Sequence, residues 1–420
     1  MDVSHEVTME VVLAPGRLER AWVAVKRNRG APGIDGMSIA DTASHLRQHW
    51  SAVRAKLDAG VYTPAAVRGV TIPKPQGGER LLGIPTVQDR LIQQSLAQVL
   101  SAVFDPTFSE HSYGFRPGRS AHDAVKAAQA FVRSGKRWVV DIDLSAFFDH
   151  VNHDLLFERL KPHITDKRVL ALIGRYLRAP MVLGDERQKR QQGTPQGGPL
   201  SPVLANIYLD VLDRELERRG LSFCRYADDI NIFVGSERSA QRVLQSMITW
   251  IEKHLKLPVN RAKSGAGRPQ DRQMLGFRIQ EDGRIAIAPK SLDKFKAKVR
   301  VLWSARQGLT SRELIRQWQA YVRGWCNYFQ LAEIRWVMIP LEKWLRRHIR
   351  KCFWQRWHDR KGRLNALLRL GARPCHLRVA AASTGAWRMA RTGALQTVLA
   401  NRTLRRYGMW MPSELWANPS

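Results

Sequence analysis

Hydrophobic positions follow two different periods along this chain. Apolar runs rich in strand-forming residues cover residues 137–144 and 230–234, where they predict β-strands. Between such runs, residues 121–132 carry apolar positions at helical spacing, and Ser120 can cap the helix that they predict. Because strand and helix patterns interleave before Pro289, we expect an α+β fold in that part of the chain.

After Pro289 the pattern becomes helical. Thr310 and Glu313 stand at the spacing of a capping box, which predicts that a helix begins there. Apolar residues then recur on one face of that helix, and we interpret this stripe as core packing. The stripe consists of Leu314, Trp318, Tyr321, Trp325 and Tyr328. The basic residues Arg312, Arg316 and Arg323 fall largely on other faces.

A second helical stretch covers residues 341–357 and is rich in cations. Its basic members are Arg346, Arg347, Arg350, Lys351 and Arg356. These side chains are candidates for contacts with RNA, and a solvated surface is the alternative. From Lys290 to Ser420 the chain carries 27 Lys and Arg against six Asp and Glu, and ten of the 14 tryptophans. This change of composition predicts a domain boundary near Pro289.

The charge of the whole chain narrows the class of partner. Its 420 residues include 68 Lys and Arg against 37 Asp and Glu, a formal net charge of +31. Such an excess attracts polyanions, so nucleic acid is the expected partner, with a basic ribosomal or membrane-surface protein as the alternative on charge alone. The length suggests two or three domains. A hydrophobic content of 44% is not that of a disordered chain.

The cysteines are scattered and form no C-x-x-C pair, so they support neither a zinc ribbon nor a disulfide framework. They are Cys224, Cys326, Cys352 and Cys375. The chain shows no charged-then-apolar leader, and no apolar stretch reaches the ~18 residues needed to cross a bilayer. We therefore expect a soluble, intracellular protein.

Two clusters of aspartates carry the strongest chemical signal. Asp228 and Asp229 end the sequence Tyr-Ala-Asp-Asp, at the tip of a tight hairpin predicted by the flanking apolar runs. Asp141 and Asp143 share one face of an earlier strand, and periodicity does not decide which of them meets the hairpin. Adjacent carboxylates repel each other in apolar surroundings, so a cation such as Mg²⁺ should compensate them. A plain Asp-Asp turn is the alternative for the pair alone.

Together the two clusters could hold two metal ions, which can activate an attacking hydroxyl and stabilise the leaving oxygen of a phosphoryl transfer. That is the chemistry of polymerases and nucleases. Three segments, in the expected order, then resemble group II intron reverse transcriptases. They are DLSAFFD at 143–149, GTPQGGPLSP at 193–202 and the YADD box at 226–229.

This resemblance implies a right-hand-like polymerase, in which fingers and a palm with an antiparallel sheet precede a helical thumb or maturase domain. In that family the first metal ligand lies five residues before an aromatic that excludes the ribose 2′-hydroxyl. This spacing maps the ligand to Asp143 and the gate to Phe148. Asp228 and Asp229 would complete the catalytic site for two Mg²⁺ ions. Asp141 would have a structural role or would orient the metal ligands without binding the metal itself.

The resemblance also implies cationic residues around an incoming nucleotide. Residues 72–85 resemble the family's fingers hairpin, with Lys74 and Arg80 available to neutralise a triphosphate. Lys263 occupies the place of the lysine proposed to protonate the leaving pyrophosphate, and an ordinary surface lysine is the alternative.

Further segments extend the resemblance. The loop at 193–202 is similar to the one that positions template and nucleotide, where Gln196 touches the minor-groove side and Gly197 permits close backbone approach. Segments at 30–36 and 112–120 match intron-encoded proteins and are lacking in retroviral polymerases.

The end of the chain resembles the same family. Residues 323–329 resemble its maturase or thumb region, and 385–392 resemble the closing segment of members without an endonuclease. The histidines and paired cysteines of the family's optional nuclease domain are not found, so we expect no DNA cleavage and a primer made elsewhere. The expected domains are 1–60, an N-terminal RNA-binding and fingers extension; 61–289, fingers and palm; 290–375, thumb or maturase; and 376–420, a basic C-terminal segment.

We interpret the chain as an RNA-directed DNA polymerase encoded by a bacterial group II intron, which assists splicing and copies the intron into DNA during retrohoming. Expected partners are intron RNA, an RNA template, a DNA primer, deoxynucleoside triphosphates and target DNA, in the cytoplasm and without a membrane. The RNA contacts are assigned to Arg312, Arg316, Arg323, Arg346, Arg347, Arg350 and Lys351. The alternatives are a non-enzymatic RNA-binding maturase and a reverse transcriptase recruited to phage defence or CRISPR adaptation.

Overall fold

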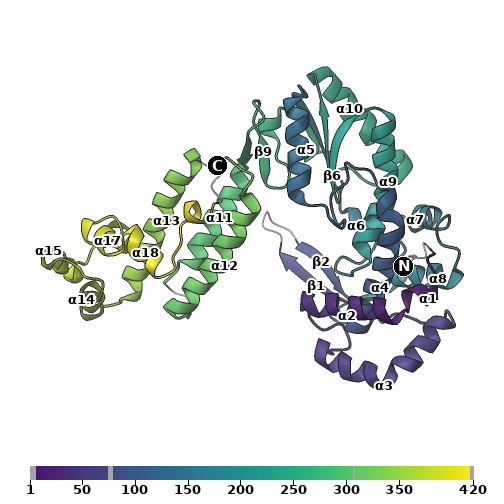
Figure 1. The fold of residues 1–420 in the computed structure, drawn as a ribbon, viewed down its shortest axis with the longest axis horizontal. Helices are drawn as coiled ribbons and strands as arrows, with labels where there is room; N and C mark the ends of the chain where they lie inside the picture. Colours follow the sequence, from purple (N-terminus) through teal and green to yellow (C-terminus); the bar gives the residue numbers. More distant parts are fainter. Residues whose placement is uncertain (1–5, 74–78, 306–307, 334, 417–420) are drawn as a thin grey trace. The chain divides into compact units, whose positions relative to one another are not determined.

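A computed structural model of the chain describes residues 6–73, 79–305, 308–333 and 335–416. The chain divides into two compact units, Met1–Arg268 and Pro269–Ser420. Helices and strands interleave in the first unit and helices dominate the second, which confirms the predicted α+β class (Figure 1). None of the helices in the described ranges combines the length and the apolar character that a membrane span requires.

The first unit carries most of the strands. Its helices are α1 (Met9–Val12), α2 (Pro15–Asn28), α3 (Ile39–Asp58), α4 (Val87–Phe104), α5 (Ala121–Arg133), α6 (Phe147–His150), α7 (His153–Leu160), α8 (Lys167–Arg178), α9 (Ser201–Arg218) and α10 (Glu237–Trp250). Its strands are β1 (Val67–Pro73), β2 (Glu79–Ile84), β3 (Trp138–Asp143), β4 (Met181–Leu183), β5 (Glu186–Gln188), β6 (Ser222–Tyr226), β7 (Asp229–Val234) and β8 (Gly265–Gly267).

The larger part of the hydrophobic core lies around a four-stranded antiparallel sheet of order β6-β7-β3-β8. β6 and β7 form the predicted hairpin, and β3 is the predicted strand before it, so both expectations are confirmed. Helices α5 and α10 pack against this sheet (Figure 1). Ser120 caps α5 as predicted, and it forms a capping box with Asp123.

A second four-stranded sheet has the order β2-β1-β4-β5. β1 and β2 pair antiparallel from Arg68 with Ile84 to Pro73 with Glu79, and β1 pairs parallel with β4. This hairpin is the segment that resembled the fingers. Lys74 lies outside the described residues.

The second unit begins with a two-stranded sheet, β9 (Phe277–Ile279) and β10 (Ile285–Ile287), paired antiparallel. Helices follow. They are α11 (Pro289–Leu302), α12 (Ser311–Phe329), α13 (Arg335–Arg356), α14 (Arg360–Arg369), α15 (Pro374–Leu377), α16 (Ala386–Met389), α17 (Gly393–Val398), α18 (Asn401–Arg406) and α19 (Pro412–Leu415). The boundary expected near Pro289 coincides with the start of α11, whereas the compact units divide between Arg268 and Pro269.

Helix α12 begins at the predicted capping box of Thr310 and Glu313. Its apolar stripe is buried as expected at Leu314, Trp318 and Trp325. Tyr328, at the edge of the stripe, is 38% exposed, and its hydroxyl donates a hydrogen bond to the Leu275 carbonyl, 2.8 Å away.

All four cysteines are unpaired. Cys224, Cys326 and Cys352 are buried, and burial raises the pKa of each thiol, to about 12 at Cys326 and about 11 at Cys352. Cys375 is exposed. Three of the thiols are therefore held in the protonated, inert form.

Candidate active site

The aspartates meet at one end of the β6-β7-β3-β8 sheet. In the antiparallel pairing of β3 with β7, Asp143 lies directly opposite Asp229, whereas Asp141 lies opposite Asn231. Directly opposed residues of neighbouring strands share a sheet face, with Cβ atoms roughly 5 Å apart. The turn between β6 and β7 holds Asp228 next to this pair. The register therefore brings Asp143, and less directly Asp141, to the hairpin.

The electrostatics of these carboxylates are unfavourable as long as all are ionised. Burial raises the pKa of Asp228 above its usual value, and the nearby Asp143 carboxylate adds to that effect. Burial, followed by the charges of Asp228, Asp141 and Asp143, raises the pKa of Asp229 to about 6. The side chain of Asp229 reaches solvent, but the protein around its carboxylate is dense enough to oppose ionisation. A cation at this place would relieve the repulsion.

Two cationic side chains lie near the carboxylates. The positive charge of Arg80, on β2, acts on Asp228 and favours its ionised form. Lys263 lies 3.4 Å from Asp143, measured between its ammonium nitrogen and Oδ2. Because the Lys263 side chain is 64% exposed, this ion pair contributes little to stability. Both residues were predicted to serve the site, and both lie beside it.

The segment that carries Lys263 is tied to the end of β3. The backbone amide of Asp143 donates to the Ser264 hydroxyl at 3.0 Å, and the Asn260 amide donates to the Asp143 carbonyl at 2.9 Å. These contacts hold the segment alongside Asp143 and keep the lysine within reach of its carboxylate.

The donor set of the cluster is oxygen-rich, which suits a hard divalent cation such as Mg²⁺. In the arrangement seen, however, the described part of the chain holds no group of three or more His, Cys, Asp or Glu side chains close enough to bind a single ion. Asp143 is turned to Lys263 instead. The residues fit a metal by charge and chemistry, and a change of side-chain rotamers would have to bring them together.

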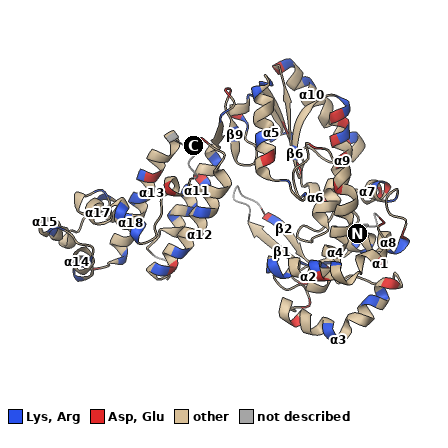
Figure 2. Ribbon diagram, in the orientation of Figure 1, with Lys and Arg blue, Asp and Glu red and all other residues tan. Residues whose placement is uncertain are grey.

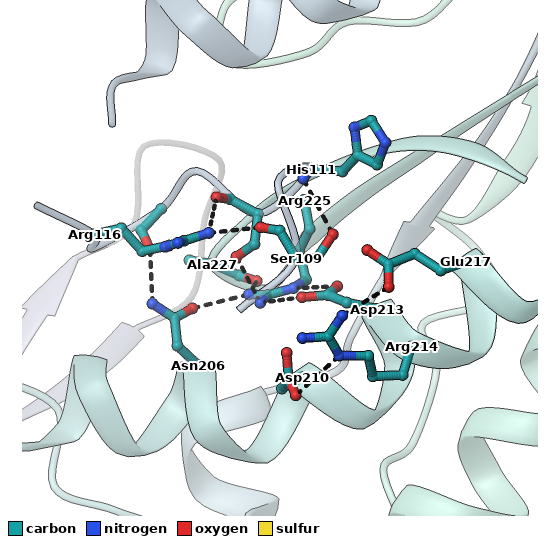
Figure 3. A network of polar contacts seen from close by, with 12 residues as sticks. Ser109, His111, Arg116, Asn206, Asp210, Asp213, Arg214, Glu217, Arg225 and Ala227 are labelled. Carbon is teal, nitrogen blue, oxygen red and sulfur yellow. Dashed lines mark hydrogen bonds and ion pairs between the residues drawn. The ribbon is translucent and has the colours of Figure 1, made fainter. Parts of the chain in front are cut away.

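A buried arginine, Arg225, supports the turn that carries Asp228 (Figure 3). Arg225, in β6, and Asp213, in α9, are both fully buried and form a two-pronged ion pair with distances of 2.6 and 2.7 Å. The same guanidinium donates to the Asn206 side chain at 2.9 Å and to the Ser112 hydroxyl at 2.7 Å. A buried, saturated arginine of this kind fixes its neighbours in one geometry.

The arginine also contacts the turn directly. It donates to the carbonyl of Ala227 at 3.0 Å, and Ala227 adopts a left-handed conformation with φ 57°. Non-glycine residues adopt this conformation at some cost in free energy. Gly114 packs against the same turn so closely that a Cβ there would lie 2.3 Å from the Ala227 nitrogen. Asn206 holds Gly114 in place by donating to its carbonyl at 2.8 Å.

Sequence reasoning missed this support. The signal was present, since Arg225 is a charge inside an apolar strand and Asp213 interrupts an apolar helical face next to Leu212. Each needed a buried partner of opposite charge. The sequence did not show that Arg225 and Asp213 are each other's partners.

The loop at 193–202 lines a pocket of about 560 Å³. Phe148, Gln196 and Gly197, three of the predicted nucleotide-binding residues, share this pocket with Gly30 and Arg90. None of the aspartates lines it, although Phe148 follows Asp143 by only five residues. The pocket size is within the range of ~300–1,000 Å³ that is typical of small-ligand sites.

The position of this loop depends on two glycines. Gly193 and Gly197 have φ values of 81° and 124°, in the region that favours glycine. A Cβ on Gly197 would lie 2.6 Å from the carbonyl oxygen of Gly83 in β2, and the Gly83 amide donates to the Gln196 carbonyl at 2.7 Å. The loop is therefore bonded to the hairpin that carries Arg80.

The predicted RNA-binding residues lie in different environments. Arg312 and Arg316 are exposed on α12, and Lys351 is half-buried on α13. Arg323 and Arg347 cover the rings of Trp410 and Trp387. Arg346 pairs with Glu342 at 3.4 Å. Arg350 donates to the Leu399 carbonyl at 3.2 Å, and burial lowers its pKa to about 10.

The second unit as a whole presents many cations. Lys and Arg positions recur along helices α11 to α14 and α18, with few acidic positions among them (Figure 2). This distribution agrees with the compositional contrast in the sequence.

Comparisons with known proteins identify the family. The protein-family model described as reverse transcriptase (RNA-dependent DNA polymerase) matches residues 72–279, and the one described as group II intron, maturase-specific domain matches residues 292–370. Protein YkfC of Escherichia coli (strain K12) is 29% identical over 61% of this chain and 78% of its own length.

Two further proteins are similar to parts of this chain. The group II intron-encoded protein LtrA of Lactococcus lactis subsp. cremoris is 39% identical over 51% of this chain, a match that spans only 36% of LtrA. A chain of a partial Cas6-RT-Cas1--Cas2 complex is 26% identical over 59% of this chain and 43% of its own, with a TM-score of 0.38, which is too low to support an argument. On its reverse transcriptase and maturase-specific domains, this chain belongs to the group II intron-encoded reverse transcriptases.

Proposed function

We propose that this chain is an RNA-directed DNA polymerase encoded by a group II intron, that it binds the intron RNA to assist splicing, and that it copies that RNA into DNA during retrohoming. The observation that carries the proposal is the register of β3 with β7, which sets Asp143 opposite Asp229 and beside Asp228. Three carboxylates at one end of the central sheet of a polymerase-family fold are suited to phosphoryl transfer once a change of rotamers lets them share metal ions.

In this proposal Asp143, Asp228 and Asp229 hold two Mg²⁺ ions. When bound, such ions supply Lewis-acid stabilisation of the attacking and leaving oxygens. The chain itself keeps the carboxylates aligned, because Arg225 fixes the turn that presents Asp228 and the strand pairing fixes Asp143. Asp141 supports the site from its place opposite Asn231.

The residues around the carboxylates position the nucleotide. The ring of Phe148 borders the pocket and would exclude a ribose 2′-hydroxyl, while Gln196 and Gly197 form the wall against which a base pair would lie. Arg80, and Lys74 beyond the described residues, would neutralise the triphosphate. Lys263 would give a proton to the leaving pyrophosphate, and for that its ammonium must leave Asp143.

Intron RNA is proposed to bind the second unit together with the N-terminal extension. The exposed cations Arg312 and Arg316 are better placed for RNA than Arg350, whose guanidinium is occupied by the Leu399 carbonyl. The protein would favour the splicing-competent RNA fold by binding it more tightly than other folds, so that the ribozyme carries out the chemistry. The domain limits at 60, 289 and 375, the lack of endonuclease activity and the cytoplasmic location remain predictions.

The test is primer extension on an RNA template with Mg²⁺ and deoxynucleotides. Wild-type protein and the control Asp185→Asn, an exposed acid far along the chain from the cluster, should extend the primer. Asp228→Ala and Asp229→Ala should not. If folded wild type gave no product yet promoted splicing of its flanking intron, the polymerase proposal would be wrong and only the maturase would remain.

The two alternatives are less well supported. A non-enzymatic maturase would not require Asp143, Asp228 and Asp229 together at one end of the sheet. A reverse transcriptase recruited to phage defence or CRISPR adaptation is not favoured by the maturase-specific match at 292–370. Intron RNA domains in the DNA on either side of the coding sequence would support the proposal, and their absence would support recruitment.

A further inference from the structure

A pocket of about 450 Å³ lies within the second unit, and none of its lining residues is assigned to the active site. It opens between the start of α12, the end of α13, the end of α14 and the segment that follows α18. Its floor is apolar and includes Leu399 and Met409, both buried. A concave, mostly apolar pocket of this size can accept one small, flat group.

Aromatic rings make up the sides of this pocket. Phe353 comes from α13, Trp357 directly follows that helix, and Tyr407 follows α18. Tyr407 is 45% exposed, so part of its ring is open to a ligand from solvent. Trp357 meets the edge of Trp354 at 6.2 Å between ring centroids, which holds its ring in place. Two aromatic faces from separate segments can stack on a planar ligand.

Among the described residues, the two charged side chains on the lining are both positive. Arg356 donates to the Leu309 carbonyl at 2.6 Å, so part of its guanidinium is occupied. Arg369 is exposed and makes no ion pair or side-chain hydrogen bond with the described residues. None of the described residues that line the pocket is acidic, and the segment from Lys290 to Ser420 is strongly basic. An anionic ligand is therefore favoured over a neutral or cationic one.

We propose that this pocket binds one unpaired nucleotide of a nucleic-acid strand, with the base stacked against Trp357 and Tyr407 and a phosphate bound by Arg369. Planar aromatic base and anionic phosphate together match the lining, which neither a peptide nor a lipid headgroup does. The inference rests on the proposed binding of intron RNA and adds a place where one flipped-out base would be held. Single-stranded RNA is the favoured source, and single-stranded DNA shares the same chemistry.

The experiment uses the full chain and a six-nucleotide RNA that carries one central 4-thiouridine. Irradiation followed by peptide mapping should join the probe to the peptides of Trp357 or Tyr407. Fluorescence anisotropy with a labelled copy should show that Tyr407→Ala weakens binding by roughly 5- to 100-fold, the usual worth of one stacked base. Arg369→Ala should weaken binding and flatten its salt dependence.

Two matched variants separate the pocket from general effects. Tyr407→Phe keeps the ring and should bind as the wild type does. Arg402→Ala removes the same charge as Arg369→Ala from an exposed position on α18 that does not border the pocket, and should change affinity far less. Circular dichroism melts of all variants exclude unfolding as the cause.

Crosslinks confined to other peptides, or equal affinity of Tyr407→Ala and wild type, would overturn the proposal. A DNA version of the probe tells the two sources apart. If DNA binds as tightly as RNA and Tyr407→Ala weakens both to the same degree, the pocket accepts any single strand. Primer extension is measured in parallel. If the wild type does not extend primers but crosslinks at Tyr407, the polymerase proposal is wrong and the pocket stands.

Discussion

Replacing Asp229 with asparagine should stabilise the metal-free protein while removing its ability to bind a divalent cation. In the folded state, burial and the charges of Asp228, Asp141 and Asp143 raise the pKa of Asp229 from 3.8 to about 6. At neutral pH the ionised carboxylate therefore costs free energy that asparagine, a neutral residue of the same shape, does not.

The size and the pH dependence of this effect follow from that pKa. Solvent reaches the Asp229 side chain and screens its charge, so the cost is on the order of 1 kcal/mol. For a unit of this size, that corresponds to a rise in Tm of about 2 to 4 °C. Because the folded pKa lies above the unfolded one, the wild type loses stability as pH rises from about 4 to above 6. The advantage of the variant should thus be larger at pH 8 than at pH 4.5.

The assay is thermal unfolding in EDTA at both pH values, repeated with Mg²⁺ at pH 8. Mg²⁺ should raise the Tm of the wild type and leave Asp229→Asn unchanged. Asp185→Asn, which makes the same change of charge in the exposed turn between β4 and β5, should give no gain. A lower or equal Tm of Asp229→Asn in EDTA at pH 8, or equal stabilisation of both proteins by Mg²⁺, would refute the electrostatic reasoning.

Three further substitutions test the surroundings of the site. Arg225→Lys keeps the charge but loses the two-pronged pair with Asp213, so it should lower Tm and reduce kcat by at least about tenfold. Arg116 is another arginine with a buried side chain, but it does not contact the turn, so Arg116→Lys should lower Tm while the folded protein keeps its kcat. An equal loss of kcat in Arg225→Lys and Arg116→Lys would contradict this. Phe148→Ala should raise ribonucleotide incorporation relative to deoxynucleotide by at least about tenfold, and an unchanged ratio would remove Phe148 from the gate. Gly197→Ala should cost about 1 to 3 kcal/mol in unfolding experiments, more than Gly184→Ala, whose Cβ would meet nothing within 4 Å.

Local signals predicted the elements around the site well. The β6-β7 hairpin follows from two apolar runs that meet at a short polar turn, and the capping boxes at Ser120 and Thr310 fix two helix starts. Each of these features depends on residues within a few positions of one another. Physical propensity therefore suffices to find them.

Long-range contacts could not be predicted in the same way. Asp141 and Asp143 share a strand face, so periodicity does not distinguish them; the family resemblance favoured Asp143, and the register with β7 sets it opposite Asp229. The side chains that bind the Arg225 guanidinium lie 12 to 113 residues away in sequence, and the carbonyl that occupies Arg350 is 49 residues away. Composition identified these side chains as charged but did not contain their partners, because the partners are set by tertiary packing.

The distribution of thiols gives this protein a natural labelling site. Because Cys224, Cys326 and Cys352 are buried and protonated, a maleimide dye added to the native chain should react at Cys375 alone. A fluorophore could thus be attached to the second unit without any substitution. Its anisotropy and emission would then report on that unit in real time while an RNA is bound, copied or released.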